Sequence, residues 1–595
     1  MEAGTAPATT GSRTMADLMA RAAEAHAGAA MVRHKVDGAW QDVTYAEVGE
    51  IAGEIGRGLI DLGIAGGDRV CILCNTRPEW SYADFGASAA GAVVVPIYPT
   101  NSPEECEYIV ADSDAIAVVC EDAAQVAKIT EVRDRLPALR FVIVVDGDGA
   151  PDDAITLDEI RARGRGRDLA ELQARADAVA LDDPFTIIYT SGTTGPPKGC
   201  VLTHGNYRSM VDMCTALSVL ESGDITYLFL PLAHSFALLI QLLNVDLGGT
   251  IAYFGGDTTQ IIPEIGEVKP TYLPSVPRIF EKLYTLAQNM LPPEEIELIR
   301  TVGGEIQDLE LAGQEVPAEL RERFAPVAPK AEFVRNLFGG RLRQAVSGAA
   351  PIAKEILEFF WGAGVPVLEG YGMTETATAA TYSTVKEHRF GTVGRPFPGV
   401  EIKIAEDGEI LVKGGNIFAG YHKNKDASFG AIEDGWLHTG DLGSLDADGY
   451  LSITGRKKDI IITAGGKNLT PANFENDMKQ TRWVSQCVMH GDRRPYPVAL
   501  VTLDPEEMAA WAAQHGIEDA SPAALATNAE VRALIQGEID RVNQRYAQVE
   551  QVKKFVILDH DLSQETGELT PTLKVKRNVV NEKYSQLFED LYTGK

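Results

Sequence analysis

The chain alternates short apolar runs with amphipathic segments over much of its length. Between residues 68 and 146, helix-like segments such as 103–111 separate four runs rich in β-branched residues, at 70–74, 92–97, 115–120 and 141–145. This alternation predicts parallel strands, because each helix carries the chain back to the start of the next strand. The pattern resumes at 225–230, 250–254, 271–273 and 344–346. The first part of the chain is therefore predicted to be one large α/β domain.

Later segments change this pattern. Residues from about 280 to 337 are charged and helix-forming, which predicts a helical insertion. Residues 400–413 alternate strictly between polar and apolar around Asp407-Gly408, which predicts an antiparallel hairpin. Strand signals at 498–503 and 555–558 surround an Ala-rich helical region, as in an α+β domain. We divide the chain into a disordered tail (1–13), an N-terminal domain (14–455) and a C-terminal domain (456–595).

The composition narrows the classes of function. At 595 residues the chain is too long for a single core. Its net charge of -31 disfavours a nucleic-acid partner, since polyanions would be repelled. The N-terminus lacks the apolar core of a signal peptide, and polar residues interrupt the most apolar run, 236–254, before it reaches the ~20 residues of a membrane span. We expect no transmembrane segment and leave peripheral membrane contact open.

Seven cysteines are scattered along the chain. This usage suits the reducing cytoplasm better than a disulfide scaffold. The one close pair, Cys71 and Cys74, lies in a strand pattern without a second pair, so a structural role is favoured over metal binding.

A glycine- and hydroxyl-rich loop follows the strand-like run 185–189. It reads Tyr189-Thr-Ser-Gly-Thr-Thr-Gly-Pro-Pro-Lys198-Gly199. Glycines let the backbone approach an anion, hydroxyls donate hydrogen bonds to it, and the lysine adds a positive charge. The spacing differs from that of a Walker loop, in which Gly-Lys-Ser/Thr closes the motif. We expect phosphate to bind at Thr190, Ser191, Gly192, Thr193, Thr194, Gly195 and Lys198.

A second motif, Glu369-Gly370-Tyr371-Gly372-Met-Thr374-Glu375, follows the strand-like run 365–368. At the end of a sheet strand it would present an aromatic face, a hydroxyl and a carboxylate, which suit adenine, phosphate and Mg²⁺. Alone, the motif also fits a structural turn. Because it follows the phosphate loop in the sequence, the motif indicates a nucleotide site.

Three weaker candidates lie elsewhere. Gly348, Ala349 and Ala350 follow a short strand where backbone could approach adenine, although tight strand–helix packing explains them equally well. Asp441 could accept both hydroxyls of a ribose, although a lone Thr-Gly-Asp is more often a turn. His234 stands among apolar residues, where a histidine is more often part of the core or its rim.

In this order, the motifs resemble those of the adenylate-forming enzymes, which include acyl-CoA synthetases, luciferases and the adenylation domains of peptide synthetases. The resemblance extends from about Thr14 to Leu587. It implies a large N-terminal α/β domain, with mixed sheets and a small β-barrel-like part, and a smaller mobile α+β C-terminal domain.

The resemblance also implies roles in the nucleotide site. Tyr371 stacks on adenine, Thr374 contacts the α-phosphate, and Glu375 ligates Mg²⁺ with help from Thr190. Asp441 binds the ribose with Arg456, and Gly348, Ala349 and Ala350 approach the adenine edge. His234 is implied to lie near the acyl chain and the incoming thiol.

The C-terminal part carries the remaining implied roles. Lys574 corresponds to the adenylation lysine, but Leu573 stands where many members have glycine, so Lys576 is the competing assignment. Lys458 corresponds to the hinge between two catalytic orientations. Gly465, Gly466 and Lys467 correspond to the loop along the pantetheine path.

The implied activity is that of an ATP-dependent long-chain fatty acid:CoA ligase that uses ATP, Mg²⁺ and coenzyme A. Segments 274–282 and 569–577 resemble long-chain members. The alternatives are an acyl-AMP ligase that serves a separate carrier protein, an aryl- or medium-chain-acid CoA ligase, and a catalytically silent acyl or nucleotide binder. We expect a cytoplasmic monomer or homodimer with small-molecule substrates.

Overall fold

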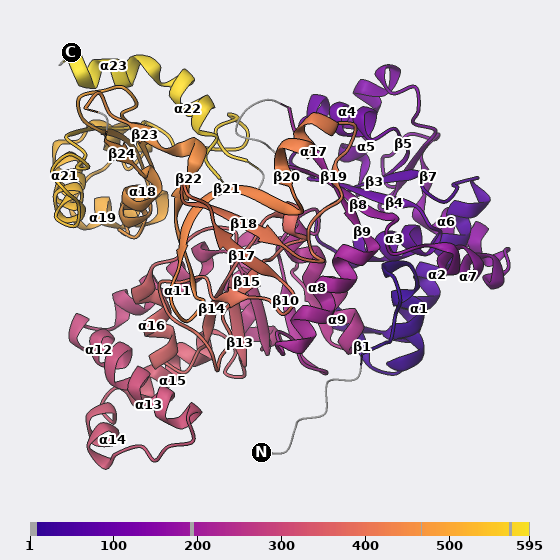
Figure 1. Ribbon diagram of the computed structural model, residues 1–595, viewed down its shortest axis with the longest axis horizontal. Helices are drawn as coiled ribbons and strands as arrows, with labels where there is room; N and C mark the ends of the chain where they lie inside the picture. The colour runs from indigo at the N-terminus through magenta and orange to yellow at the C-terminus, as the bar shows by residue number, and fades with distance from the viewer. Residues whose placement is uncertain (1–8, 191–195, 466, 571–573, 594–595) are drawn as a thin grey trace.

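An eight-stranded sheet forms one half of the N-terminal part (Figure 1). The computed structural model describes residues 9–190, 196–465, 467–570 and 574–593. The predicted run of parallel strands is confirmed: β3 (Arg69–Leu73), β4 (Val93–Ile97), β5 (Ala115–Cys120) and β6 (Phe141–Val144) pair in parallel. The sheet order is β19-β9-β8-β4-β3-β5-β6-β7, with β7 at Ile155–Thr156, β8 at Pro184–Thr190, β9 at Lys198–Thr203 and β19 at Gly420–Tyr421.

A nine-stranded sheet forms the other half, in the order β16-β15-β14-β13-β12-β10-β11-β1-β2. Its central strands run in parallel, and antiparallel pairs close both edges. The strands are β1 (Ala30–Val36), β2 (Ala39–Thr44), β10 (Ile225–Leu228), β11 (Thr250–Tyr253), β12 (Tyr272–Ser275), β13 (Gln344–Ser347), β14 (Val367–Tyr371), β15 (Thr381–Tyr382) and β16 (Arg395–Pro396).

Helices pack with these sheets in a shared apolar core. The helix α9 (Ser235–Leu247) is buried at all but one of its positions. Buried polar residues of α9 are paired within the protein; Gln241, for example, donates to Asp84 over 2.9 Å. The other helices of this part of the chain are α1 (Met15–Ala25), α2 (Tyr45–Asp61), α3 (Pro78–Ala89), α4 (Pro103–Asp112), α5 (Ala123–Val132), α6 (Leu157–Arg165), α7 (Leu169–Ala178) and α8 (His204–Ala216).

The expectation of disorder up to residue 13 is wrong for residues 9–13. Thr10 donates its hydroxyl and its backbone N–H to the Asp246 carboxylate on α9, and Arg208 donates to the Ser12 hydroxyl over 2.8 Å. Asp246 is fully buried and needs such donors, so the short polar segment is held against the core.

A five-stranded sheet follows, and it confirms the hairpin around Asp407-Gly408. Its strands are β17 (Glu401–Ile404), β18 (Glu409–Lys413), β20 (Ile432–Glu433), β21 (Trp436–Leu445) and β22 (Leu451–Arg456), with α17 (Lys425–Ala431) before β20. Gly408 has φ of +88°, which glycine adopts without strain.

Helices occupy the segment between β12 and β13 and pack in a second apolar cluster. They are α11 (Pro277–Met290), α12 (Pro293–Leu298), a π-helical turn (Ile299–Gly303), α13 (Gly304–Leu311), α14 (Ala318–Phe324) and α15 (Ala328–Leu337). Two further helices, α10 (Ile261–Val268) before β12 and α16 (Lys354–Gly362) after β13, pack in the same cluster. The π-helical turn and α16 pack with their backbones in close contact at Gly303 and Gly362. A side chain at either position would clash with the backbone of the other segment.

The chain beyond Lys458 has its own apolar clusters. Its three-stranded sheet orders β25 (Val484–His490), β26 (Val498–Leu503) and β27 (Lys554–Ile557), and a small hairpin joins β23 (Ile461–Ile462) to β24 (Asn468–Leu469). The helices are α18 (Pro471–Lys479), α19 (Pro505–Gln514), α20 (Pro522–Thr527), α21 (Ala529–Asn543), α22 (Arg577–Lys583) and α23 (Ser585–Thr593). In the described part of the chain, no helix is both long and apolar enough to cross a membrane.

Candidate active site

The phosphate-loop motif joins two paired strands. Thr190 ends β8 and lies opposite Lys198, the first residue of β9. The Lys198 ammonium lies 5.0 Å from the centre of the Tyr421 ring, and the Thr190 hydroxyl lies 3.9 Å from Cys200 Sγ. The predicted phosphate ligands Ser191, Gly192, Thr193, Thr194 and Gly195 lie outside the described residues.

The second motif follows β14 and folds back on itself. At Gly372, a Cβ atom would lie 2.2 Å from the Thr378 carbonyl oxygen, so only glycine fits there. Thr374 and Glu375 then form a buried 3₁₀ turn, which ends in the left-handed conformations of Ala377 and Thr378. Such conformations cost energy for residues other than glycine and often occur at functional sites. The turn thus holds the hydroxyl of Thr374 and the carboxylate of Glu375 in fixed positions.

Tyr421 links the two motifs, and sequence reasoning missed it. Its hydroxyl donates to Glu375 Oε1 over 2.8 Å, while its ring lies beneath Lys198. Tyr421 belongs to β19, which pairs with β9 from more than two hundred residues away. The only sequence signal is an aromatic residue after a glycine, which is too common to mark a site.

Thr190 and Glu375 converge on Cys200, so a hydroxyl and a carboxylate oxygen face the same region. Oxygen donors of this kind suit Mg²⁺, which commonly takes one or two protein ligands and completes its shell with phosphates and water. No group of three or more His, Cys, Asp or Glu side chains arranged for a metal occurs among the described residues. The donor set therefore fits a metal that binds together with a nucleotide.

Asp441 lies between its predicted partner Arg456 and Tyr371, the residue predicted to stack on adenine. Its Oδ2 accepts a hydrogen bond from the Tyr371 hydroxyl, and its Oδ1 accepts one from Arg456 Nε, both over 2.8 Å. Asp441 and Arg456 are directly paired in β21 and β22, so the sheet register sets this contact. The structure brings the second motif, the predicted ribose ligand and Arg456 into one cluster.

Lys574 lies at this cluster, although it comes from the far end of the chain. The protein that surrounds it and the charge of Arg456 lower the pKa of Lys574 to about 8, while the negative charges of Asp441 and Glu375 act in the opposite direction. Lys574 is also exposed to solvent, so a substrate can reach it. Lys574 therefore faces the carboxylates that the sequence assigns to ribose and metal.

Ion pairs of two buried carboxylates hold the hairpin that carries Lys574, in which Leu569 pairs with Val575. At one end, Glu568 is fully buried and accepts hydrogen bonds from Lys583 (2.6 Å), Tyr584 and Thr566. Although burial opposes its charged form, these bonds lower the pKa of Glu568 to about 2. At the other end, Arg577 donates to Glu475 of α18 over 2.6 Å and 2.8 Å.

His234 is the residue before α9, and its Nδ1 accepts from the backbone N–H of Phe236 over 3.2 Å. Nε2 therefore carries the proton of the neutral ring. Burial and the nearby charge of Lys574 lower the pKa of His234 to about 4, so the ring is neutral at physiological pH. The structure thus brings His234 and Lys574 together.

The remaining adenine candidates follow β13. Gly348 packs against Phe236, since an added Cβ would lie 3.5 Å from that ring, and Ala349 adopts φ of +68°. Ala349 and Ala350 are exposed. On the neighbouring strand, Glu369 is paired with Ser347, and burial raises the pKa of Glu369 to about 8. Sequence reasoning quoted Glu369 but gave it no role.

The predicted hinge and pantetheine residues lie apart from this cluster. Lys458 is exposed in a 3₁₀ turn after Arg456, and its neighbour Lys457 pairs with Glu409 of β18 over 2.9 Å. Gly465 is exposed, and Lys467 lies 3.6 Å from Glu550 of its own domain. Gly466 lies outside the described residues.

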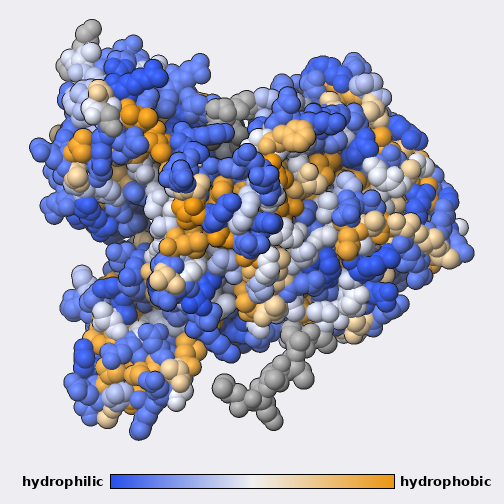
Figure 2. Space-filling view, in the orientation of Figure 1, coloured by the Kyte–Doolittle hydropathy of each residue, from blue (hydrophilic) through white to orange (hydrophobic). Residues whose placement is uncertain are grey.

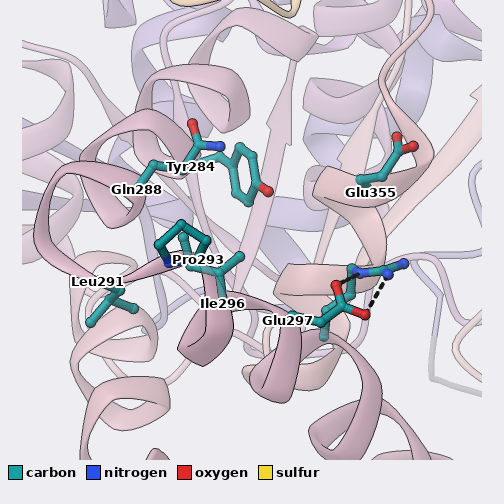
Figure 3. A pocket seen from close by; sticks show the side chains of 8 residues that line it. Tyr284, Gln288, Leu291, Pro293, Ile296, Glu297 and Glu355 are labelled. Atoms are coloured by element: carbon teal, nitrogen blue, oxygen red, sulfur yellow. Dashed lines mark hydrogen bonds and ion pairs between the residues drawn. The ribbon is translucent and has the colours of Figure 1, made fainter.

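A pocket of about 290 Å³ lies elsewhere, among the helices before β13 (Figure 3). Tyr284 and Gln288 of α11 line it, together with Ile296 and the ion pair between Arg300 and Glu297. None of the predicted site residues lines this pocket.

Family models and known proteins resemble the chain over nearly its whole length. The AMP-binding enzyme model matches residues 19–422, and the AMP-binding enzyme C-terminal domain model matches residues 458–595. Long-chain-fatty-acid–CoA ligase FadD15 of Mycobacterium bovis is 40% identical over 564 residues, which cover 94% of this chain and 93% of that protein. Long chain acyl-CoA synthetase 6, peroxisomal, of Arabidopsis thaliana is 32% identical, over 94% of this chain and 83% of that protein.

Solved structures share the fold at lower sequence identity. The anthranilate CoA ligase AuaEII in complex with anthranoyl-AMP has a TM-score of 0.75 at 21% identity, with 99% of this chain and 100% of that chain covered. O-succinylbenzoate CoA synthetase of Bacillus subtilis, in complex with AMP, has a TM-score of 0.68 at 22% identity, with 94% and 97% covered.

Proposed function

We propose that this chain, which belongs to the AMP-binding enzyme family, is an ATP-dependent long-chain fatty acid:CoA ligase. In the first half-reaction, a carboxylate oxygen of the fatty acid attacks the α-phosphorus of ATP, the bond to the bridging oxygen breaks, and pyrophosphate leaves. In the second, the CoA thiolate attacks the acyl carbon and displaces AMP, and the thiol proton passes to solvent. The products are acyl-CoA, AMP and pyrophosphate.

The observation that carries this proposal is the meeting of Lys574 with Asp441, Glu375 and His234. These residues come from four separate parts of the sequence, and their chemistry suits one reaction. A cation between a ribose-binding carboxylate and a metal-binding carboxylate lies where the acid and the α-phosphate would meet. There it would neutralise negative charge that develops during the attack.

The other residues would hold the nucleotide. Asp441 would accept the ribose hydroxyls, and Arg456 and the Tyr371 hydroxyl orient its carboxylate. The Tyr371 ring offers a face for adenine, and Gly348 to Ala350 offer backbone to its edge. Lys198 and the loop from Thr190 to Gly195 would bind the β- and γ-phosphates, and Thr374 the α-phosphate. Thr190 and Glu375 would hold Mg²⁺, which neutralises phosphate charge when it is bound.

Neutral His234 suits the acyl side of the site. Its Nε2–H can donate to the substrate carboxylate or to the carbonyl oxygen of the intermediate, and an uncharged ring does not compete with Lys574 for the carboxylate. In the second half-reaction, rotation about Lys458 would remove Lys574 and bring Gly465, Gly466 and Lys467 to the pantetheine arm. We propose Lys574 rather than Lys576 as the adenylation lysine, because the Lys574 ammonium interacts with Asp441 and Glu375.

A long-chain substrate is supported by the relatives at 32–40% identity whose names specify long-chain fatty acids. Burial of the chain gives about 0.8 kcal/mol per methylene, so two carbons change affinity by roughly tenfold in a dry tunnel. Seven free, buried cysteines support a cytoplasmic location.

The test is a series of fatty acids of increasing length with ATP, Mg²⁺ and CoA, read by mass spectrometry. We expect acyl-CoA and AMP, with the rate rising towards long chains. Acyl-AMP that persists in the presence of CoA would point to a separate carrier protein as acceptor. Lys574→Ala should suppress acid-dependent pyrophosphate exchange and leave thioester formation from supplied acyl-AMP largely intact; the same result for Lys576→Ala instead would reverse our assignment.

A further inference from the structure

Two cations on α11 connect the N-terminal domain to the C-terminal domain. Arg278 forms an ion pair with Asp504, and Lys282 Nζ lies 3.2 Å from Glu506 Oε2. Across residues 9–190, 196–465, 467–570 and 574–593, these are the only ion pairs between residues before 456 and residues after 458. Both cations belong to the segment 274–282, to which the proposed chemistry gives no task.

The charges on the two sides of this contact are complementary. On α11, Glu281 stands between the two cations, and Lys479 at the end of α18 lies within electrostatic range of it. Burial raises the pKa of Glu281, and the charges of Arg278 and Lys479 oppose this change. Arg278, Glu281 and Lys282 on α11 thus each interact with an opposite charge of the C-terminal domain. Figure 2 shows hydrophilic surface on both sides of the notch between these parts, at the left of the view.

Both sides of this contact are fixed to their own domains. On α11, Phe280 and Leu283 are fully buried in the apolar cluster of the helical part. On the other side, Asp504 Oδ1 accepts the first backbone N–H groups of α19 at 3.1 Å, which leaves Oδ2 for Arg278. The ion pairs therefore link two helices, α11 and α19, that are each anchored in their own domain.

The pairs are also able to separate. The side chains of Arg278 and Lys282 are each 41% exposed, and that of Glu506 is 78% exposed. Ion pairs so open to water are weak and are screened by salt. A weak contact suits a domain that must adopt a second orientation in each cycle, because a strong one would trap the first orientation.

We propose that Arg278 and Lys282 are positioning residues that hold the C-terminal domain in the orientation in which Lys574 faces Asp441 and Glu375. Rotation about Lys458 carries Asp504 and Glu506 away from α11, so the pairs support the adenylation half-reaction and open for thioester formation. This inference rests on the proposed function for its kinetic part. The domain contact itself can be measured without activity.

The test compares the wild-type enzyme with Arg278→Gln/Lys282→Gln in the full-length chain. We expect acid-dependent pyrophosphate release to fall about threefold to tenfold, because fewer molecules hold Lys574 in place. Thioester formation from supplied acyl-AMP and CoA should stay within about twofold or become faster. The matched control is Lys330→Gln, which removes a cation paired with Glu295 inside the helical part. A charge swap completes the series: Lys282→Glu should lower pyrophosphate release, and Lys282→Glu/Glu506→Lys should restore it.

Domain orientation is read separately from trypsin cleavage at the linker Arg456-Lys457-Lys458. Cleavage there should become faster in the double variant, and in the wild type at high salt, but not in Lys330→Gln. Equal losses in both half-reactions, no recovery in the charge swap, or unchanged linker cleavage would each overturn the inference. If no acid supports pyrophosphate release in the wild type while linker cleavage responds as expected, the proposed function fails and the domain contact stands.

Discussion

The charge state of Lys574 predicts how adenylation responds to pH. With a pKa of about 8, the ammonium is about nine-tenths protonated at pH 7 and about one-tenth protonated at pH 9. If the charged form neutralises the attacking carboxylate and the α-phosphate, kcat/KM for adenylation should fall about tenfold over this interval. The relevant parameter is kcat/KM for ATP, because it reports the pKa values of the free enzyme.

The assay is acid-dependent pyrophosphate release at constant ionic strength from pH 6.5 to 9.5, with hydroxylamine to trap the acyl group. Arginine keeps its charge throughout this range. The Lys574→Arg enzyme should therefore show no fall in kcat/KM at alkaline pH, even if its rate is lower at every pH. Arg456→Gln removes the charge that lowers the Lys574 pKa, so the midpoint should rise; Asp441→Asn should lower it.

Glu369 also has a pKa of about 8 and lies among the described residues near the site, so Glu369→Gln serves as the control. In Glu369→Gln, the fall in kcat/KM that we assign to Lys574 should remain. A wild-type profile that is flat from pH 7 to 9 would refute the reasoning. So would a fall of the same midpoint in Lys574→Arg, because it would assign the titration to another group.

Three further predictions test single contacts. At Gly164 of α6, a Cβ would lie 1.8 Å from the Glu54 carbonyl oxygen of α2, so Gly164→Ala should lower the free energy of unfolding by about 1–3 kcal/mol in urea titrations. Gly537 of α21 faces open space, so Gly537→Ala should raise the free energy of unfolding by about 0.5–1 kcal/mol. Equal effects of the two variants would contradict the close contact between α6 and α2. Tyr421→Phe should raise the Mg²⁺ concentration needed for half-maximal adenylation about fivefold, through loss of one bond to Glu375, and an unchanged Mg²⁺ dependence would separate Tyr421 from the metal site. Glu568→Gln should slow adenylation and spare thioester formation from acyl-AMP, because Glu568 fixes the hairpin of Lys574; equal slowing of both would indicate a general folding defect.

Local patterns predicted much of the fold. The parallel strands and the hairpin at Asp407-Gly408 depend on residues close together in sequence, and the structure places them within a residue or two of the expected bounds. The order of residues 9–13 could not be predicted in this way. It depends on Asp246, which lies far along the chain and lacks donors within its own helix.

The candidate site shows the same division between local and distant contacts. Tyr371 and Glu375 could be named because their motif follows a strand and resembles a known family motif. The structure adds that Gly372 stands where the backbone passes closely. Tyr421 could not, because only the pairing of β19 with β9 brings it to Glu375. Motifs therefore identify residues that carry chemistry, and sheet register identifies those that orient them.

Neither motifs nor sheet register predict how the two domains are oriented relative to each other. The proposed hinge residue Lys458 can be named from its motif. A hinge allows many orientations, however, and our proposal requires that one of them be stabilised for Lys574 to act. The contacts able to do this are surface charges, Arg278 and Lys282 against Asp504 and Glu506, which a sequence presents as ordinary solvated residues. Their weakness follows from their task. An enzyme that uses two orientations in each cycle gains from a contact strong enough to favour one orientation and weak enough to release it.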